Sequence, residues 1–122
     1  MPDAAPFTFP HPFGSSASAR EELAALDRDA AALPIRGPIA GLVSEISREL
    51  TCLVIADRAS HEAAPLLRPH GERAFQLTGS VRGMRAICHR AAGLDPRHAE
   101  RRRDMIDKAW DGIGDSRGAW AA

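Results

Sequence analysis

The stretch GPIAGLVSEISRELTCLVIA, residues 37–56, decides the fold class of this 122-residue chain. At about 100° per residue, its apolar side chains fall on one face of a helix and its charged side chains on the opposite face. The apolar face holds Ile39, Leu42, Val43, Ile46, Leu50, Leu53 and Val54, and the charged face holds Glu45, Arg48 and Glu49. Pro38 fits the first turn of such a helix, because its missing N–H has no partner to lose there. The pattern predicts an amphipathic helix.

The end of the same stretch also permits a buried strand. Residues 50–56 are almost wholly apolar and include Val54 and Ile55, which favour strands. A strand near 51–56 would pair with one near 73–78, and the fold would then be α/β. The helical pattern holds for about 16 residues, whereas strands average about five or six. The sequence therefore favours an all-α domain over the α/β alternative.

A second helix signal covers residues 18–33. Ser18 and Glu21 form a capping box, in which each side chain accepts a hydrogen bond from an otherwise unpaired backbone N–H. Pro34 ends the run. The apolar positions of this helix are Leu23, Leu26, Ala30 and Leu33.

Two more helices are expected in the second half of the chain. One runs from Ser80 to a glycine cap at Gly93, and the next opens at Asp95 and reaches about residue 113. Pro65 and Pro69 interrupt residues 59–79, where we expect a loop with at most one short helix. The expected architecture is one four-helix domain over residues 18–113.

The two ends of the chain lack helical periodicity. Residues 1–17 hold four prolines and predict an extended arm, and residues 114–122 predict a short tail. Aromatic side chains are few overall but gather at these ends, where a self-sufficient core would not place them. Aromatic anchors carry much of the binding energy at protein interfaces. The candidate partner-binding residues are therefore Phe7, Phe9, Phe13 and Trp120.

Composition excludes several classes of protein. Sixteen basic and sixteen acidic residues cancel, and no apolar run of the length that spans a bilayer occurs. The length suits one domain with one core. The N-terminus lacks the basic and apolar segments of a secretory signal, so a cytoplasmic location is expected. Fifteen arginines against the single Lys108 indicate a G+C-rich bacterial coding bias.

The segment MRAICHRAAGLDPRHAERRRDMI, residues 84–106, resembles a bacterial helix-turn-helix, in which a second helix enters the major groove. The resemblance rests on the turn, Gly93 to Pro96, followed by an arginine-rich helix. It departs from the motif at His89, where a small residue is usual, and at Arg102, where an apolar one is usual. Its implied recognition residues are Arg97, His98, Arg101 and Arg102, with Arg82 and Arg85 on the preceding helix able to contact phosphates. The alternative is an ordinary solvated face carrying i, i+4 ion pairs such as Arg103 with Asp107.

Other chemistry has weaker support in the residues. Cys52 and Cys88 have apolar neighbours and are expected to be buried, reduced thiols. No metal-binding motif and no catalytic triad spacing occurs, so no cofactor and no enzymatic activity are predicted. The expected function is a small non-catalytic adaptor or accessory subunit that binds a protein partner, or itself. The alternative is a DNA-binding regulator that uses residues 80–110.

Overall fold

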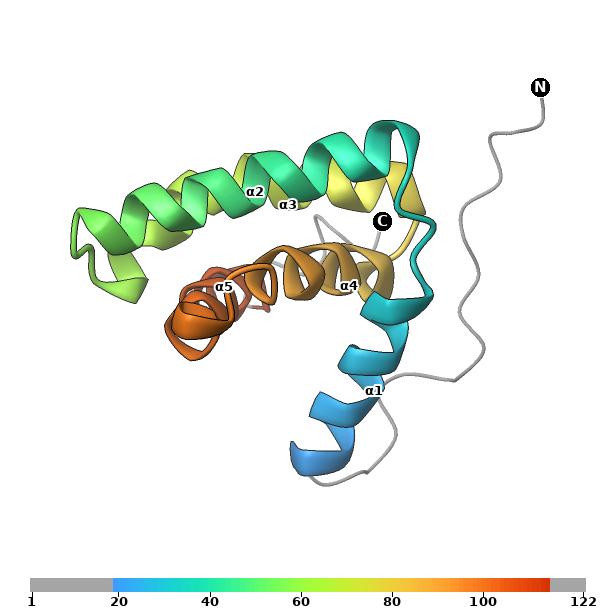
Figure 1. Cartoon of the computed structure of the whole chain (residues 1–122), viewed down its shortest axis with the longest axis horizontal. Helices are drawn as coiled ribbons and strands as arrows, with labels where there is room; N and C mark the ends of the chain where they lie inside the picture. Colours follow the sequence, from blue (N-terminus) through green and yellow to red (C-terminus); the bar gives the residue numbers. More distant parts are fainter. Residues whose placement is uncertain (1–18, 115–122) are drawn as a thin grey trace.

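The computed structural model describes the backbone of residues 19–114 and the side chains of residues 20–109. Within this range the chain forms five α-helices and one 3₁₀ turn (Figure 1). They are α1 (Ala19–Ala32), α2 (Gly37–Ile55), α3 (Ser60–Thr78), α4 (Val81–Ala92), η2 (Pro96–His98) and α5 (Ala99–Gly114). Residues 51–55 and 73–78 are helical, and no strand occurs among the described residues. The all-α prediction is confirmed, and the α/β alternative is wrong.

The amphipathic stretch forms α2 as predicted, and its apolar face supplies the centre of the core. Its fully or nearly buried residues are Leu42, Val43, Ile46, Leu50 and Leu53. Asp57 then takes a left-handed conformation with φ 54°. The N–H groups of Asp57 and Arg58 donate to the carbonyls of Val54 and Leu53, which is the hydrogen-bond pattern that closes many helix ends.

Residues 60–78 form one continuous helix, α3, so the loop expected for 59–79 is wrong. Pro65 and Pro69 lie inside it, and both are exposed. Each proline removes one backbone hydrogen bond. Because the two are four residues apart, the carbonyls left without a donor share a face that water reaches. The opposite face is buried at helical spacing and holds the segment in the core through Ala63, Ala64, Leu67, Gly71, Ala74 and Thr78.

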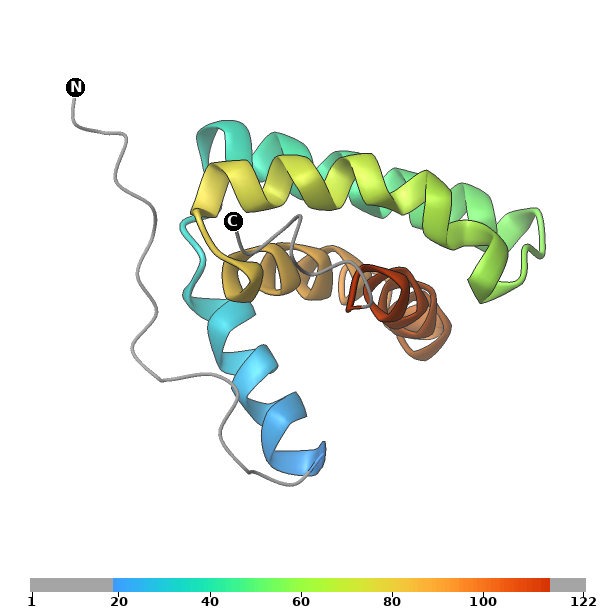
Figure 2. The ribbon, with the colours of Figure 1, turned by 180° about the vertical axis from the view of Figure 1, so that it is seen from behind.

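The helices pack in two layers with α1 set apart. Figures 1 and 2 show α2 and α3 side by side in one layer, with α4 and α5 beneath them. α3 packs on both α4 and α5, whereas α1 packs mainly on α4. The first turns of α1 therefore stand away from the body in both views. No helix in the described part of the chain has the length and apolarity needed to cross a bilayer.

The junction between α3 and α4 brings their backbones very close. Gly79 ends α3 with φ 75°, and the Ser80 hydroxyl caps α4 by accepting a hydrogen bond from the Gly83 N–H at 2.9 Å. A Cβ on Gly83 would overlap the side chain of Thr78, so any other residue there would have to displace it. Thr78 in turn donates to the carbonyl of Ala74 at 2.8 Å. This contact fixes where α4 leaves α3, and α4 forms the floor of the site described below.

Candidate functional site

An open groove of about 930 Å³ lies between α1 and α5. The first turns of α1 form one wall, the outer face of α5 forms the other, and α4 contributes Arg85 and His89. Two smaller hollows adjoin the groove, and both also contact His89 and Arg103. The groove exists because α1 is attached to α4 and diverges from α5.

The α1 wall is the end of an apolar stripe that begins in the core. Leu33 and Ala30 are buried, Leu26 is half-buried, and Leu23 is 43% exposed. The stripe thus continues beyond the part of α1 that the body covers. A single exposed leucine is ordinary on a protein surface, but this one extends a buried stripe and lines a groove. Leu23 and Leu26 thus form the apolar part of the groove's lining.

Two pairs fasten α1 to α4. Both carboxylate oxygens of the buried Asp29 accept hydrogen bonds from Arg82, at 2.8 Å and 2.7 Å. Oδ1 of Asp27 lies 2.6 Å from Nε2 of His89. A bidentate guanidinium–carboxylate pair is among the stronger polar links in proteins. Arg82, predicted to contact phosphates, is therefore a structural residue that holds α1 in place.

The α5 wall carries charges of both signs, several of which are engaged within the chain. Arg101 donates to the Asp57 carboxylate at 2.8 Å and to the Arg58 carbonyl at 3.2 Å. Asp104 accepts a hydrogen bond from the Ser60 hydroxyl at 2.5 Å. Both contacts tie α5 to the end of α2 and the start of α3. The charged groups of this wall thus include several that serve the packing of the helices.

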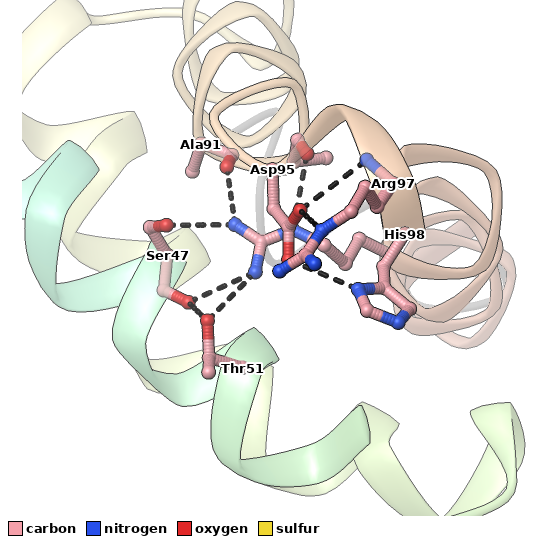
Figure 3. A network of polar contacts seen from close by, with 8 residues as sticks. Ser47, Thr51, Ala91, Asp95, Arg97 and His98 are labelled. Carbon is pink, nitrogen blue, oxygen red and sulfur yellow. Dashed lines mark hydrogen bonds and ion pairs between the residues drawn. The ribbon is translucent and has the colours of Figure 1, made fainter. Parts of the chain in front are cut away.

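Arg102 is fully buried, and its prediction as a nucleic-acid contact is wrong. Its guanidinium donates five hydrogen bonds, all within the core. The acceptors are the carbonyls of Ala91 at 2.7 Å, Ala92 at 3.0 Å and Ser47 at 3.3 Å, and the hydroxyls of Ser47 at 2.7 Å and Thr51 at 2.9 Å. Figure 3 shows Ser47 and Thr51 of α2 and Ala91 of α4 pointing toward one common group of hydrogen-bond donors.

The physical reason for this burial is the end of α4. Gly93 has an ordinary right-handed conformation with φ −73°, so the last carbonyls of α4 are not closed by a left-handed glycine. Arg102 pairs with these carbonyls instead, where the helix dipole favours a cation. Burial lowers the pKa of the Arg102 guanidinium, and the charge of Asp95 opposes this effect. An arginine nevertheless stays protonated in proteins.

Asp95, Arg97 and His98 form a small exposed cluster at the turn before α5 (Figure 3). The carboxylate of Asp95 lies 3.0 Å from Nδ1 of His98 and accepts a hydrogen bond from the Arg97 backbone at 3.3 Å. The hydrogen bond with His98 is the main reason why the pKa of Asp95 lies below its ordinary value. The predicted cap at Asp95 is confirmed. The Arg97 side chain is 87% exposed and does not belong to the lining of the groove.

The six predicted nucleic-acid residues do not form one surface. Arg85 and Arg101 line the groove, Arg97 and His98 lie at the turn, Arg82 pairs with α1, and Arg102 is buried. The predicted partner-binding residues Phe7, Phe9, Phe13 and Trp120 lie outside the described residues, so they stay a prediction. The groove itself was not predicted. The sequence signals that fall on it are the apolar stripe of α1 and the two arginines Arg85 and Arg101.

Neither cysteine belongs to the lining of the groove. Cys88 is buried as predicted, and burial raises the pKa of its thiol. Cys52 is exposed on α2, so the expectation that both thiols are buried is wrong for this one. In the part of the chain that the structure describes, no three His, Cys, Asp or Glu side chains gather as they would around a metal ion.

Comparison with models of protein families, with curated proteins and with solved structures finds no match to this chain. Its function is therefore inferred from its own residues.

Proposed function

We propose that this chain is a non-catalytic protein-binding module, an adaptor or accessory subunit whose groove between α1 and α5 receives part of another polypeptide. The observation that carries the proposal is the lining of the groove. Leu23 is 43% exposed there beside charged side chains of both signs. Interfaces between proteins combine an apolar centre with a polar rim of mixed charge.

The same lining argues for protein rather than nucleic acid. A surface that binds the phosphate backbone neutralises it with lysines and arginines. Here Arg85, Arg101, Arg103 and Lys108 alternate with acids on the walls of the groove. The acids are Glu22, Glu100, Asp104 and Asp107. These carboxylates would repel phosphates, so the helix-turn-helix hypothesis has less support than protein binding.

The test compares two leucines of similar exposure. Leu23 lies in the groove, and Leu66 on α3 is 46% exposed outside its lining. The full chain, Leu23→Glu and Leu66→Glu are each isolated gently from the natural host and weighed by native mass spectrometry. We expect the wild type and Leu66→Glu to carry a second polypeptide, and Leu23→Glu to appear as a bare 13.1 kDa chain.

Three results would overturn the proposal. They are a wild type that carries no polypeptide, a Leu23→Glu variant that keeps its partner, and a wild type that carries duplex DNA lost at high salt.

The terminal aromatics are tested in the same way. Replacing Phe7, Phe9, Phe13 and Trp120 by Ala should abolish association while the helical circular dichroism stays unchanged, if these residues anchor the partner.

A further inference from the structure

Opposite charges face each other across the groove without meeting. Glu22 lies on the α1 wall, and Arg103 and Lys108 lie on the α5 wall. Among the described residues, none of these three side chains forms an ion pair or hydrogen bond. Glu100, at the start of α5, also has no partner there, so the unpaired charge of the α5 wall is one acid and two bases.

Arg103 is the most informative of these charges. Its side chain is half-buried, and it also lines both smaller hollows beside the groove. A half-buried guanidinium has lost part of its hydration, and a carboxylate would restore its hydrogen bonds with favourable geometry. The occupant of the groove should therefore present an acidic side chain to Arg103 and an apolar side chain to Leu23.

The first turns of α1 themselves carry this combination. Glu22 is adjacent to the exposed Leu23, and Leu26 continues the apolar stripe. α1 projects from the body, so these turns are accessible to another molecule (Figure 2). The α1 wall is thus complementary in charge to the α5 wall. It is also accessible to the α5 wall of another molecule. Such self-complementarity is what a two-fold symmetric interface requires.

We propose that the groove is occupied by α1 of a second copy of this chain, in a two-fold symmetric dimer. The inference rests on the proposed function and names the partner. Leu23 and Leu26 of one copy pack against the partner's Leu23 and the partner's Leu26. Glu22 pairs with the partner's Arg103 and the partner's Lys108, and the symmetry axis repeats this contact.

A charge exchange on the full chain tests this arrangement. Glu22→Arg and Arg103→Glu each place like charges against each other at both symmetric contacts. Each variant alone should therefore dimerise about tenfold more weakly than the wild type or worse. Mixed in equal amounts, the two variants restore opposite charges at both contacts. We expect heterodimers to form with nearly the wild-type dissociation constant, measured by sedimentation velocity and native mass spectrometry.

The matched controls make the same charge changes elsewhere. Glu72 and Arg73 are exposed on α3, outside the groove lining. Glu72→Arg and Arg73→Glu should dimerise like the wild type. A wild type that stays monomeric at all concentrations overturns the inference. A dimer that is not weakened by Glu22→Arg, by Arg103→Glu or by Leu23→Glu also overturns it. Single variants that weaken the dimer without recovery on mixing would exclude the Glu22–Arg103 contact and with it the proposed geometry.

The inference and the proposed function can fail separately. If the wild type is monomeric when pure but carries a different polypeptide that Leu23→Glu releases, the second copy is excluded and the protein-binding groove stands. If the dimer forms through another surface and nothing binds at Leu23, both are wrong.

Discussion

On the side of α5 that faces α2 and the end of α4, Arg102 is fully buried and donates five hydrogen bonds. On the side that faces the groove, the next residue, Arg103, is half-buried and has no partner among the described residues. Successive residues of a helix point about 100° apart. An arginine side chain is therefore buried and fully hydrogen-bonded at one position and available to another molecule at the next, because the surrounding helices differ.

The two sides of the α4–α5 pair differ in the same way. The closed side holds Ile87 and Met105, which are fully buried, and the close approach of Gly83 to Thr78. The open side holds the groove, and two pairs with α4 fasten α1 beside it. Substitutions of buried residues on either side should therefore change stability, and substitutions of exposed residues in the groove should change association. Four predictions test this division.

The largest effect is expected at Arg102. Arg102→Met keeps much of the side-chain volume but leaves the carbonyls of α4 and the hydroxyls of Ser47 and Thr51 without their donor. We expect the free energy of unfolding to fall by about 3 to 5 kcal/mol, since each buried unsatisfied group costs about 1 to 3 kcal/mol. Urea denaturation followed by circular dichroism measures this loss. Arg103→Met is the matched control and should stay within about 0.5 kcal/mol of the wild type. If the free energy of unfolding falls equally in the two variants, the buried side and the groove side of α5 do not differ in the way described.

The next effect is expected at Asp29. Asp29→Asn removes the charge from a buried bidentate pair with Arg82, and we expect a loss of about 2 to 3 kcal/mol. The exposed Asp27 of α1 pairs with His89 of α4, and Asp27→Asn should lower the free energy of unfolding by less than about 1 kcal/mol. Hydrogen exchange of the α1 amides should accelerate much more in the first variant. If the two variants exchange at the same rate, α1 is not held by Asp29.

A smaller effect is expected from two glycine-to-alanine changes. Gly83→Ala overlaps Thr78 and forces α3 and α4 apart, with strain of about 1 to 3 kcal/mol that the better helix propensity of alanine offsets by about 1 kcal/mol. The net result is a loss of about 1 kcal/mol. Gly41→Ala on α2 meets no atom within 4 Å and should gain about 0.5 to 1 kcal/mol. Thermal unfolding measures both changes, and a stabilised Gly83→Ala would contradict the close contact.

The smallest effect concerns pH. Because the pKa of Asp95 is lowered in the folded chain, its carboxylate contributes stability that is complete above its unfolded pKa and is lost as the pH falls through the folded pKa. We expect part of the stability to disappear below about pH 4, and Asp95→Ala to reduce that loss slightly. An NMR titration measures the pKa directly. His98→Ala should return the pKa of Asp95 toward its ordinary value, and an unchanged titration would remove His98 as the cause.

Local patterns in the residues were sufficient for most of the helices. α1, α2, α4 and α5 follow their apolar spacing and their breaks at Pro34, Gly93 and Asp95. α3 differs from the predicted loop because the buried residues spaced from Ala63 to Thr78 outweigh the helix-breaking effect of Pro65 and Pro69. Prolines on a solvent-facing side cost hydrogen bonds that water can replace, whereas the buried face is stabilised by the whole core.

The roles of the polar residues could not be obtained in the same way. Periodicity operates over a few turns of one helix, so it decides that a segment is helical and which face is apolar. Asp29 and Arg82 are 53 residues apart in the chain, and Ser47 and Arg102 are 55 residues apart. The apolar spacing of α5 sets Arg102 three residues before Met105, on the buried face, and Arg103 beside that face. No local pattern, however, shows the five acceptors of α2 and α4 that Arg102 meets there. The packing of α5 between α2, α3 and α4 assigns the one to the core and the other to the groove, because burial and partners are properties of the assembled helices.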